Sequence, residues 1–129
     1  MSAAAPRFGL PRRARLLSQR EFRRVYQRGR RQSGKLLTVV GLWQRDGRGT
    51  RVGLSVSKDH GSAIRRNKIK RLLREAFRLE RPGLPPNLEV VLIPRVREDK
   101  LVLAELRREL VDLIGRLGRS EQRPRRDRS

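Results

Sequence analysis

The sequence predicts an α+β fold in which helices form a layer on one small sheet. Three stretches have the apolar spacing of helices, near residues 18–29, 62–81 and 99–118. Three apolar runs are typical of strands, at residues 35–43, 51–57 and 88–93. The order is therefore helix, strand, strand, helix, strand, helix, and a chain of 129 residues normally folds as one such domain.

The first predicted helix has clear start and stop signals. Ser18 and Glu21 form the S-x-x-E pattern of a capping box, and Gly29 is a suitable end. Phe22 and Tyr26 lie four residues apart on its apolar side. Such a pair usually packs on a core, although partly exposed aromatic rings also stack on single-stranded bases. The spacing alone favours the core.

The next two apolar runs predict an antiparallel hairpin. Residues 35–43 are rich in Leu, Val and Thr, residues 51–57 alternate apolar with smaller side chains, and Asp46-Gly47 between them is a turn signal. The third run, residues 88–93, is almost wholly apolar, which is typical of a central strand. The chain between the second and third runs is long enough for a crossover that joins parallel strands.

The helix near residues 62–81 has two contrasting faces. Its apolar stripe comprises Ile69, Leu72, Leu73, Ala76 and Phe77. At about 100° per residue, the opposite arc, called here the cationic face, comprises Asn67, Lys70, Arg71, Arg74 and Arg78. Arg66 falls near the apolar arc on an ideal wheel, so we expect it in the first turn of the helix or just before it.

The last helix is expected to end near Gly118. Its leucine stripe comprises Leu103, Leu106, Leu110, Leu113 and Leu117. Residues 1–15 have no periodicity, and we expect a flexible basic arm there. Residues 119–129 are expected to form a disordered basic tail. The remaining residues 16–118 are expected to form the single domain.

The charge indicates a polyanionic partner. Lys and Arg outnumber Asp and Glu by 34 to 13, a formal charge of +21, and only +3 of it comes from residues 119–129. So large a positive charge in a small domain repels itself unless a polyanion neutralises it, which favours a nucleic-acid ligand. A membrane is disfavoured because no run of about 18 apolar residues and no signal-peptide pattern is present. The absence of Cys excludes disulfides and thiolate zinc sites and is compatible with a cytoplasmic location.

A catalytic site made of protein side chains is hard to assemble from this sequence. The single histidine, His60, has no carboxylate or hydroxyl constellation near it in sequence, and Glu75 on the basic helix is better explained as an ion-pair residue. No phosphate-binding glycine loop or nucleophile elbow is present. Arginine forks bind phosphate oxygens in pairs, so the sequence favours RNA binding over chemistry by the chain itself.

Two neighbouring motifs resemble the bacterial ribonuclease P protein subunit. These are RVGLSVSK, which begins at Arg51, and AIRRNKIKRLLREAF, which begins at Ala63. The second resembles the family pattern R-N-x-x-K-R-x-x-R, which is matched in register by Arg66, Asn67, Lys70, Arg71 and Arg74. A looser match covers about residues 12–117.

The resemblance implies an α-β sandwich whose crossover through the basic helix is left-handed, against the usual right-handed rule. It also implies a partnership with a large catalytic RNA, one protein per RNA, that removes the 5′ leader from precursor tRNA. The RNA would hold the active site and most of the Mg²⁺. No catalytic residue or metal ligand is then expected in the chain.

The family's contacts with the catalytic RNA carry over to Arg65, Arg66, Asn67, Lys68, Lys70, Arg71 and Arg74. Its leader contacts carry over to Phe22, Tyr26, Thr38, Val40 and Lys58, which reverses the preference for a core role of the aromatic pair. Lys68 stands where the family usually has arginine, which keeps the charge but not the bidentate fork. Arg65 and Asp59-His60 also depart from the family pattern.

Two alternatives remain open on the sequence. A ribosomal or other non-catalytic RNA-binding protein would share the charge and the small α+β body. A protein-only nuclease would cleave precursor tRNA without added RNA, and we expect no such cleavage.

Overall fold

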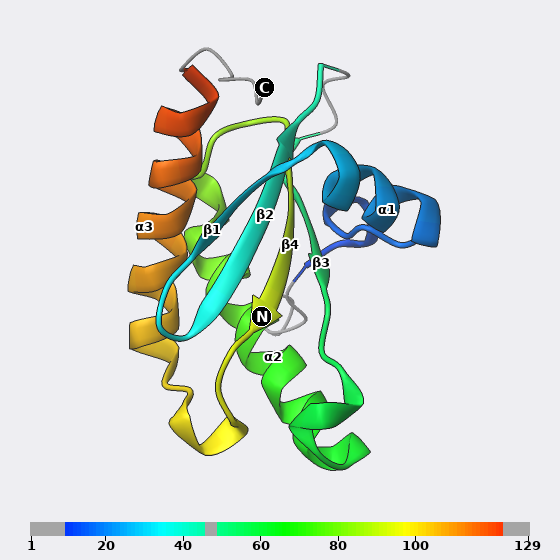
Figure 1. The fold of residues 1–129 in the computed structure, drawn as a ribbon, viewed down its shortest axis with the longest axis vertical. Coiled ribbons are helices and arrows are strands. Elements are labelled where there is room, and N and C mark those ends of the chain that lie inside the picture. Colours follow the sequence, from blue (N-terminus) through cyan, green and yellow to red (C-terminus); the bar gives the residue numbers. More distant parts are fainter. Residues whose placement is uncertain (1–9, 46–48, 123–129) are drawn as a thin grey trace, which may run out of the picture.

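The computed structural model describes residues 10–45 and 49–122, with the side chains of residues 120–122 excepted. The described helices are α1 (Gln19–Arg28), α2 (Ala63–Glu80) and α3 (Leu103–Gln122), and the strands are β1 (Arg30–Ser33), β2 (Leu37–Trp43), β3 (Arg51–Leu54) and β4 (Leu88–Pro94). In Figure 1, α2 passes behind the sheet and α3 stands to its left, whereas α1 lies to its right. The main core joins α2 and α3 to one face of the sheet, and a smaller cluster joins α1 to the other. The predicted α+β class is confirmed.

The sheet has the strand order β1-β2-β4-β3. β2 is antiparallel to β4 with Val40 opposite Val91, and β3 is parallel to β4 with Gly53 opposite Val91. The predicted hairpin of residues 35–43 with residues 51–57 is therefore wrong, because β4 lies between them. β4 is apolar on both faces, and a strand of this kind gains most from a neighbour on each side.

The sequence analysis missed β1, which is the antiparallel edge partner of β2 and pairs Ser33 with Thr38. Its sequence, RRQS, has no apolar residue and so gives no strand pattern. Charged residues are common on edge strands, where they discourage pairing with another chain.

The connection from β3 through α2 to β4 joins two parallel, adjacent strands, as predicted. The left hand of this crossover stays a prediction. Ser62 caps α2, because its Oγ accepts a hydrogen bond from the Arg65 N–H at 3.3 Å.

The capping box of α1 is confirmed. Ser18 Oγ accepts from the Glu21 N–H at 3.1 Å, and Glu21 Oε1 accepts from the Ser18 N–H at 3.3 Å and the Leu17 N–H at 2.8 Å. Gly29 ends the helix where only glycine fits. A Cβ there would lie 2.5 Å from the Val25 carbonyl oxygen and 2.7 Å from that of Gly41.

The main core fills the space between α2, α3 and the sheet. From the predicted stripe of α2, Leu72 is half-buried and Ile69, Leu73, Ala76 and Phe77 are buried. Leu103 of α3 is partly buried, and the other four leucines of its stripe are fully buried. Both amphipathic patterns are confirmed, so the opposite face of α2 is left toward solvent.

The structure differs from the predicted boundaries at both ends. Residues 10–15 belong to the folded body: Arg12–Ala14 form a short 3-10 helix, and Leu10 and Ala14 are buried in the main core. α3 continues through Gly118 to Gln122, since one helical glycine costs only about 1 kcal/mol. Residues 1–9 and 123–129, and the turn signal Asp46-Gly47, lie outside the described residues.

Candidate nucleic-acid interface

The basic side chains of α2 lie together on the side away from the core. Asn67, Arg71 and Arg74 are exposed and Lys70 is half-buried, while the motif's flanking residues Arg65 and Lys68 are also exposed. The helical period places Asn67, Lys70, Arg71 and Arg74 on one face. Arg65 lies elsewhere, because it precedes Asn67 by about 200° of helical rotation and lines a pocket with Glu98 and Asp99.

Arg66 lies in the first turn of α2, as expected from the wheel. Its Nε donates to the Gly61 carbonyl oxygen at 3.2 Å. This bond restrains the guanidinium before any ligand arrives, which lowers the entropy that binding costs.

Little negative charge opposes this surface. In the described part of the chain no ion pair involves Arg65, Arg66, Arg71 or Arg74, and Lys68 Nζ lies 3.9 Å from Glu98 Oε2 in an exposed pair. Burial and the nearby charges of Arg15 and Arg71 lower the pKa of Arg74. The mutual repulsion of these cations would be relieved by an anion.

Arg78, at the end of the cationic face, differs from the others. Its Nη2 and Nε contact Glu75 at 2.6 and 3.0 Å. The hydrogen bond from Arg78 lowers the pKa of Glu75, and the same bond raises the pKa of Arg78. Glu75 is thus an ion-pair residue, as expected, and Arg78 presents less free charge than Arg71 or Arg74.

The structure separates the two aromatic residues of α1. Phe22 is half-buried against β3, where a Cβ on Gly53 would meet the Phe22 ring at 2.5 Å. Tyr26 remains 38% exposed. Packing therefore occupies Phe22, whereas Tyr26 offers its ring to solvent.

The two β2 residues predicted to contact a leader are mostly covered. Val40 is 1% exposed and packs with Val25 and Val91 beneath α1. Thr38 is 6% exposed, and its Oγ1 lies 2.8 Å from Ser33 Oγ. Lys58 is exposed in the 3-10 helix Lys58–His60 that precedes α2. Of these three, Lys58 presents the most surface to a ligand.

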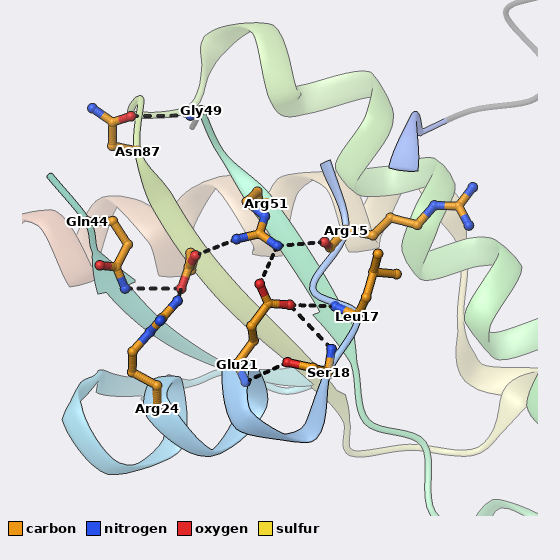
Figure 2. A network of polar contacts seen from close by, with 10 residues as sticks. Arg15, Leu17, Ser18, Glu21, Arg24, Gln44, Gly49, Arg51 and Asn87 are labelled. Atoms are coloured by element: carbon orange, nitrogen blue, oxygen red, sulfur yellow. Dashed lines mark hydrogen bonds and ion pairs between the residues drawn. The ribbon is translucent and has the colours of Figure 1, made fainter. Parts of the chain in front are cut away.

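A buried ionic network, which sequence reasoning missed, joins α1 to the sheet (Figure 2). The Arg51 network is defined here as Glu21, Arg24, Arg51 and Glu89. Arg51 contacts Glu21 at 2.6 Å and Glu89 at 2.9 Å, and Arg24 contacts Glu89 at 2.8 Å. The only local signal was an acidic residue within the apolar run of β4.

Glu89 and Arg51 are nearly inaccessible, with side chains 1% and 8% exposed. Gln44 Nε2 also donates to Glu89 at 3.1 Å, and Arg51 Nη2 donates to the Arg15 carbonyl oxygen at 3.1 Å. Although burial raises it, the bonds from the Leu17 N–H and Arg51 hold the pKa of Glu21 below its ordinary value of 4.5. The network therefore fixes both α1 and the segment before it.

The fold brings His60 close to acidic residues that are distant in sequence. Together with Asp59, Glu98 and Asp99 it lines an open pocket of about 260 Å³. Even so, among residues 10–45 and 49–122 no group of three or more His, Cys, Asp or Glu side chains could hold a metal ion. In the same residues no helix is long and apolar enough to cross a membrane.

Comparison with known proteins gives a consistent result. The sequence model of the family described as Ribonuclease P matches residues 10–118. The ribonuclease P protein component of Desulfovibrio desulfuricans is 36% identical over 116 residues, 88% of this chain and 89% of that protein. That of Chlamydia trachomatis is 42% identical over 89 residues, 69% of this chain and 73% of that protein.

Solved structures agree with the sequence matches. The RNase P protein from Thermotoga maritima superposes with a TM-score of 0.71 at 28% identity, covering 79% of this chain and 96% of that one. The RNase P protein of Staphylococcus aureus gives a TM-score of 0.69 at 25% identity, covering 79% of this chain and 93% of that one.

Proposed function

Since the chain belongs to the ribonuclease P protein family, we propose that it contacts two RNAs: the catalytic RNA through α2 and the 5′ leader of precursor tRNA beside α1. As a member of that family it is the protein component of the ribonucleoprotein that matures the 5′ end of tRNA. The comparisons do not favour the ribosomal alternative.

One observation carries the contact with the catalytic RNA: a cluster of arginines on α2 without acidic partners. Arg66, Arg71 and Arg74 each present a planar fork that matches two phosphate oxygens. Asn67 and Lys70 extend the same surface, and Arg65 and Lys68 would add contacts beside it, on the side of the helix near Glu98. The rigid apolar stripe beneath holds these groups in one arrangement, so little ordering is required on binding.

The leader contact is supported mainly by Tyr26 and Lys58. The exposed Tyr26 ring can stack on a base, a contact typical of single-stranded RNA, and Lys58 supplies charge for its phosphates. Phe22 and Val40 support this surface from below, and Thr38 lies two residues before Val40 on the same face of β2.

The mechanism we propose is electrostatic. The catalytic RNA and its substrate are both polyanions and repel each other. A chain of charge +21 placed between them lowers that cost and releases counterions. In this proposal one protein joins one RNA in the cytoplasm, the RNA carries out cleavage, and Mg²⁺ is bound mainly by the RNA.

The test combines the chain with a bacterial ribonuclease P RNA and a 5′-labelled precursor tRNA at low Mg²⁺. The chain should restore cleavage, and the triple variant Arg66→Ala, Arg71→Ala, Arg74→Ala should lose most of that effect, with less loss at high Mg²⁺. The control removes the same charge elsewhere, at the exposed Arg13, Arg108 and Arg119. Equal activity of the two triple variants at every Mg²⁺ concentration would refute the role of α2.

The same assay tests the alternative that the chain is a nuclease that needs no RNA subunit. Cleavage of precursor tRNA by the chain without added RNA would contradict the division of labour proposed here. Normal binding of the catalytic RNA with no effect on cleavage would instead support a purely structural RNA-binding role.

A further inference from the structure

We propose that Arg15, with Arg71 and Arg74, forms a binding site for an RNA backbone phosphate where the segment before α1 passes α2. The inference rests on the proposed function and adds to it a residue that lies outside both predicted contact surfaces. Sequence analysis placed Arg15 in a flexible arm, so only the fold assigns it to a site.

The backbone of Arg15 is fixed on two sides. It forms a bridge to Val52 of β3, and the next residue, Leu16, donates its N–H to the Val52 carbonyl oxygen at 2.8 Å. The Arg15 carbonyl oxygen accepts from Arg51 Nη2 at 3.1 Å. The Arg51 network therefore contacts the backbone of Arg15 as well as α1.

The side chain of Arg15 is directed as well as exposed. Its Nη2 donates to the Leu10 carbonyl oxygen at 2.9 Å, which uses one of five N–H donors. Figure 2 shows the side chain leaving the Arg51 network and extending toward α2. The remaining donors of the guanidinium are free to meet a ligand.

Three like charges lie on the two elements that adjoin here. The Arg15 side chain extends toward α2, the helix of Arg71 and Arg74 (Figure 2), and burial together with the charges of Arg15 and Arg71 lowers the pKa of Arg74. In the described residues none of the three has an ion pair. Glu21 and Glu75, acidic residues of the adjoining elements, are bound to Arg51 and Arg78. Cations gathered without a counter-charge repel one another, and a phosphate between them removes the repulsion and accepts several hydrogen bonds.

The position of the site indicates which ligand it takes. Arg15 comes three residues before the capping residue of α1, whereas Arg71 and Arg74 belong to the α2 surface. An RNA strand running from the leader surface toward the catalytic RNA would pass this point. Backbone phosphate is common to both RNAs, so the experiment has one arm for each.

The experiment compares Arg15→Gln with the matched change Arg13→Gln. Both changes replace an exposed arginine of the segment before α1 and remove one charge, and glutamine keeps a polar amide that can donate hydrogen bonds. One arm measures affinity for the catalytic RNA alone, and the other measures affinity of the assembled ribonucleoprotein for precursor tRNA, each across a salt series. Arg15→Gln should lower the affinity about 5-fold in one of these two measurements and reduce the slope of log affinity against log salt there by about one unit. Arg13→Gln should change neither quantity.

The double variant Arg15→Gln, Arg74→Gln separates binding from folding. If the three side chains share a phosphate, the loss caused by Arg15→Gln should shrink when Arg74 is already absent. An equal loss in both backgrounds, or equal effects of Arg15→Gln and Arg13→Gln, would overturn the inference. The proposed function fails separately, if the unaltered chain does not restore cleavage.

Discussion

The two faces of the sheet are attached to their helices by different physical means. On the α2 and α3 side, the main core joins Phe77, Ile69 and the α3 leucines to the sheet. On the α1 side, the buried apolar cluster among the described residues is small, with Leu16, Val25, Val40 and Val91, and the Arg51 network lies beside it. The first face is held by apolar burial, whereas the second depends on directional ion pairs.

This difference shows how a very basic chain can leave the outer surface of α1 exposed to a ligand. Val25 is the only buried residue of α1, and burying one such side chain contributes about 2 kcal/mol. Ion pairs cost desolvation and add little net stability, but their geometry is specific. They can therefore set the position of α1 while its outer residues, Tyr26 among them, remain available.

The sharpest test of the apolar face is Phe77→Ala. Phe77 is 0% exposed, so the change should leave a cavity and destabilise the fold by about 4 kcal/mol. Urea denaturation followed by circular dichroism measures the loss. If Phe77→Ala lost less stability than Arg51→Ala, the ion-paired face, and not the apolar face, would contribute more to the fold.

Arg51→Ala should have the next largest effect, about 3 kcal/mol, because it leaves the buried Glu89 with Arg24 as its remaining cation. Arg51→Lys keeps the charge but loses the bidentate fork, so its stability should lie between those of the unaltered protein and Arg51→Ala. The same denaturation series includes Arg108→Ala as an exposed control. If Arg51→Ala and Arg108→Ala are equally stable, the network does not hold α1.

Glu21→Gln isolates the charge at the edge of the network. Glutamine preserves the capping box, so the loss should be only about 1 kcal/mol at neutral pH. Because the folded pKa of Glu21 lies below 4.5, its contribution is complete above that value and disappears as the pH falls through the folded pKa. Urea midpoints of the two proteins should therefore converge in acid. A gap that does not change with pH would contradict this.

Tyr26→Ala should have the smallest effect on stability, within about 0.5 kcal/mol, since the ring is exposed. It should nevertheless weaken binding of precursor tRNA about 5-fold while leaving mature tRNA unaffected, because one stacked base is lost. Gln27→Ala, an exposed neighbour on α1, is the control. Equal effects of Tyr26→Ala on both RNAs would remove Tyr26 from the leader contact.

Local patterns were sufficient for most elements and for the α2 surface. The capping box at Ser18, the apolar stripe around Phe77 and the cationic face around Arg71 each repeat over a few residues, and the structure has all of them. The resemblance of the α2 motif to the ribonuclease P family depended on the same short stretch. Helical periodicity reports which side of an element is buried, so it is readable without knowing the partner.

Tertiary structure alone decided how these elements are combined. In the fold, β4 lies between β2 and β3, Val40 is covered, Arg51 pairs with Glu89 across 38 positions, and the Arg15 side chain is directed toward α2. None of these has a local pattern, because strand order and buried ion pairs depend on contacts between distant residues. The sequence by itself determined which surfaces are apolar and which are cationic, and the fold determined which of those surfaces meet.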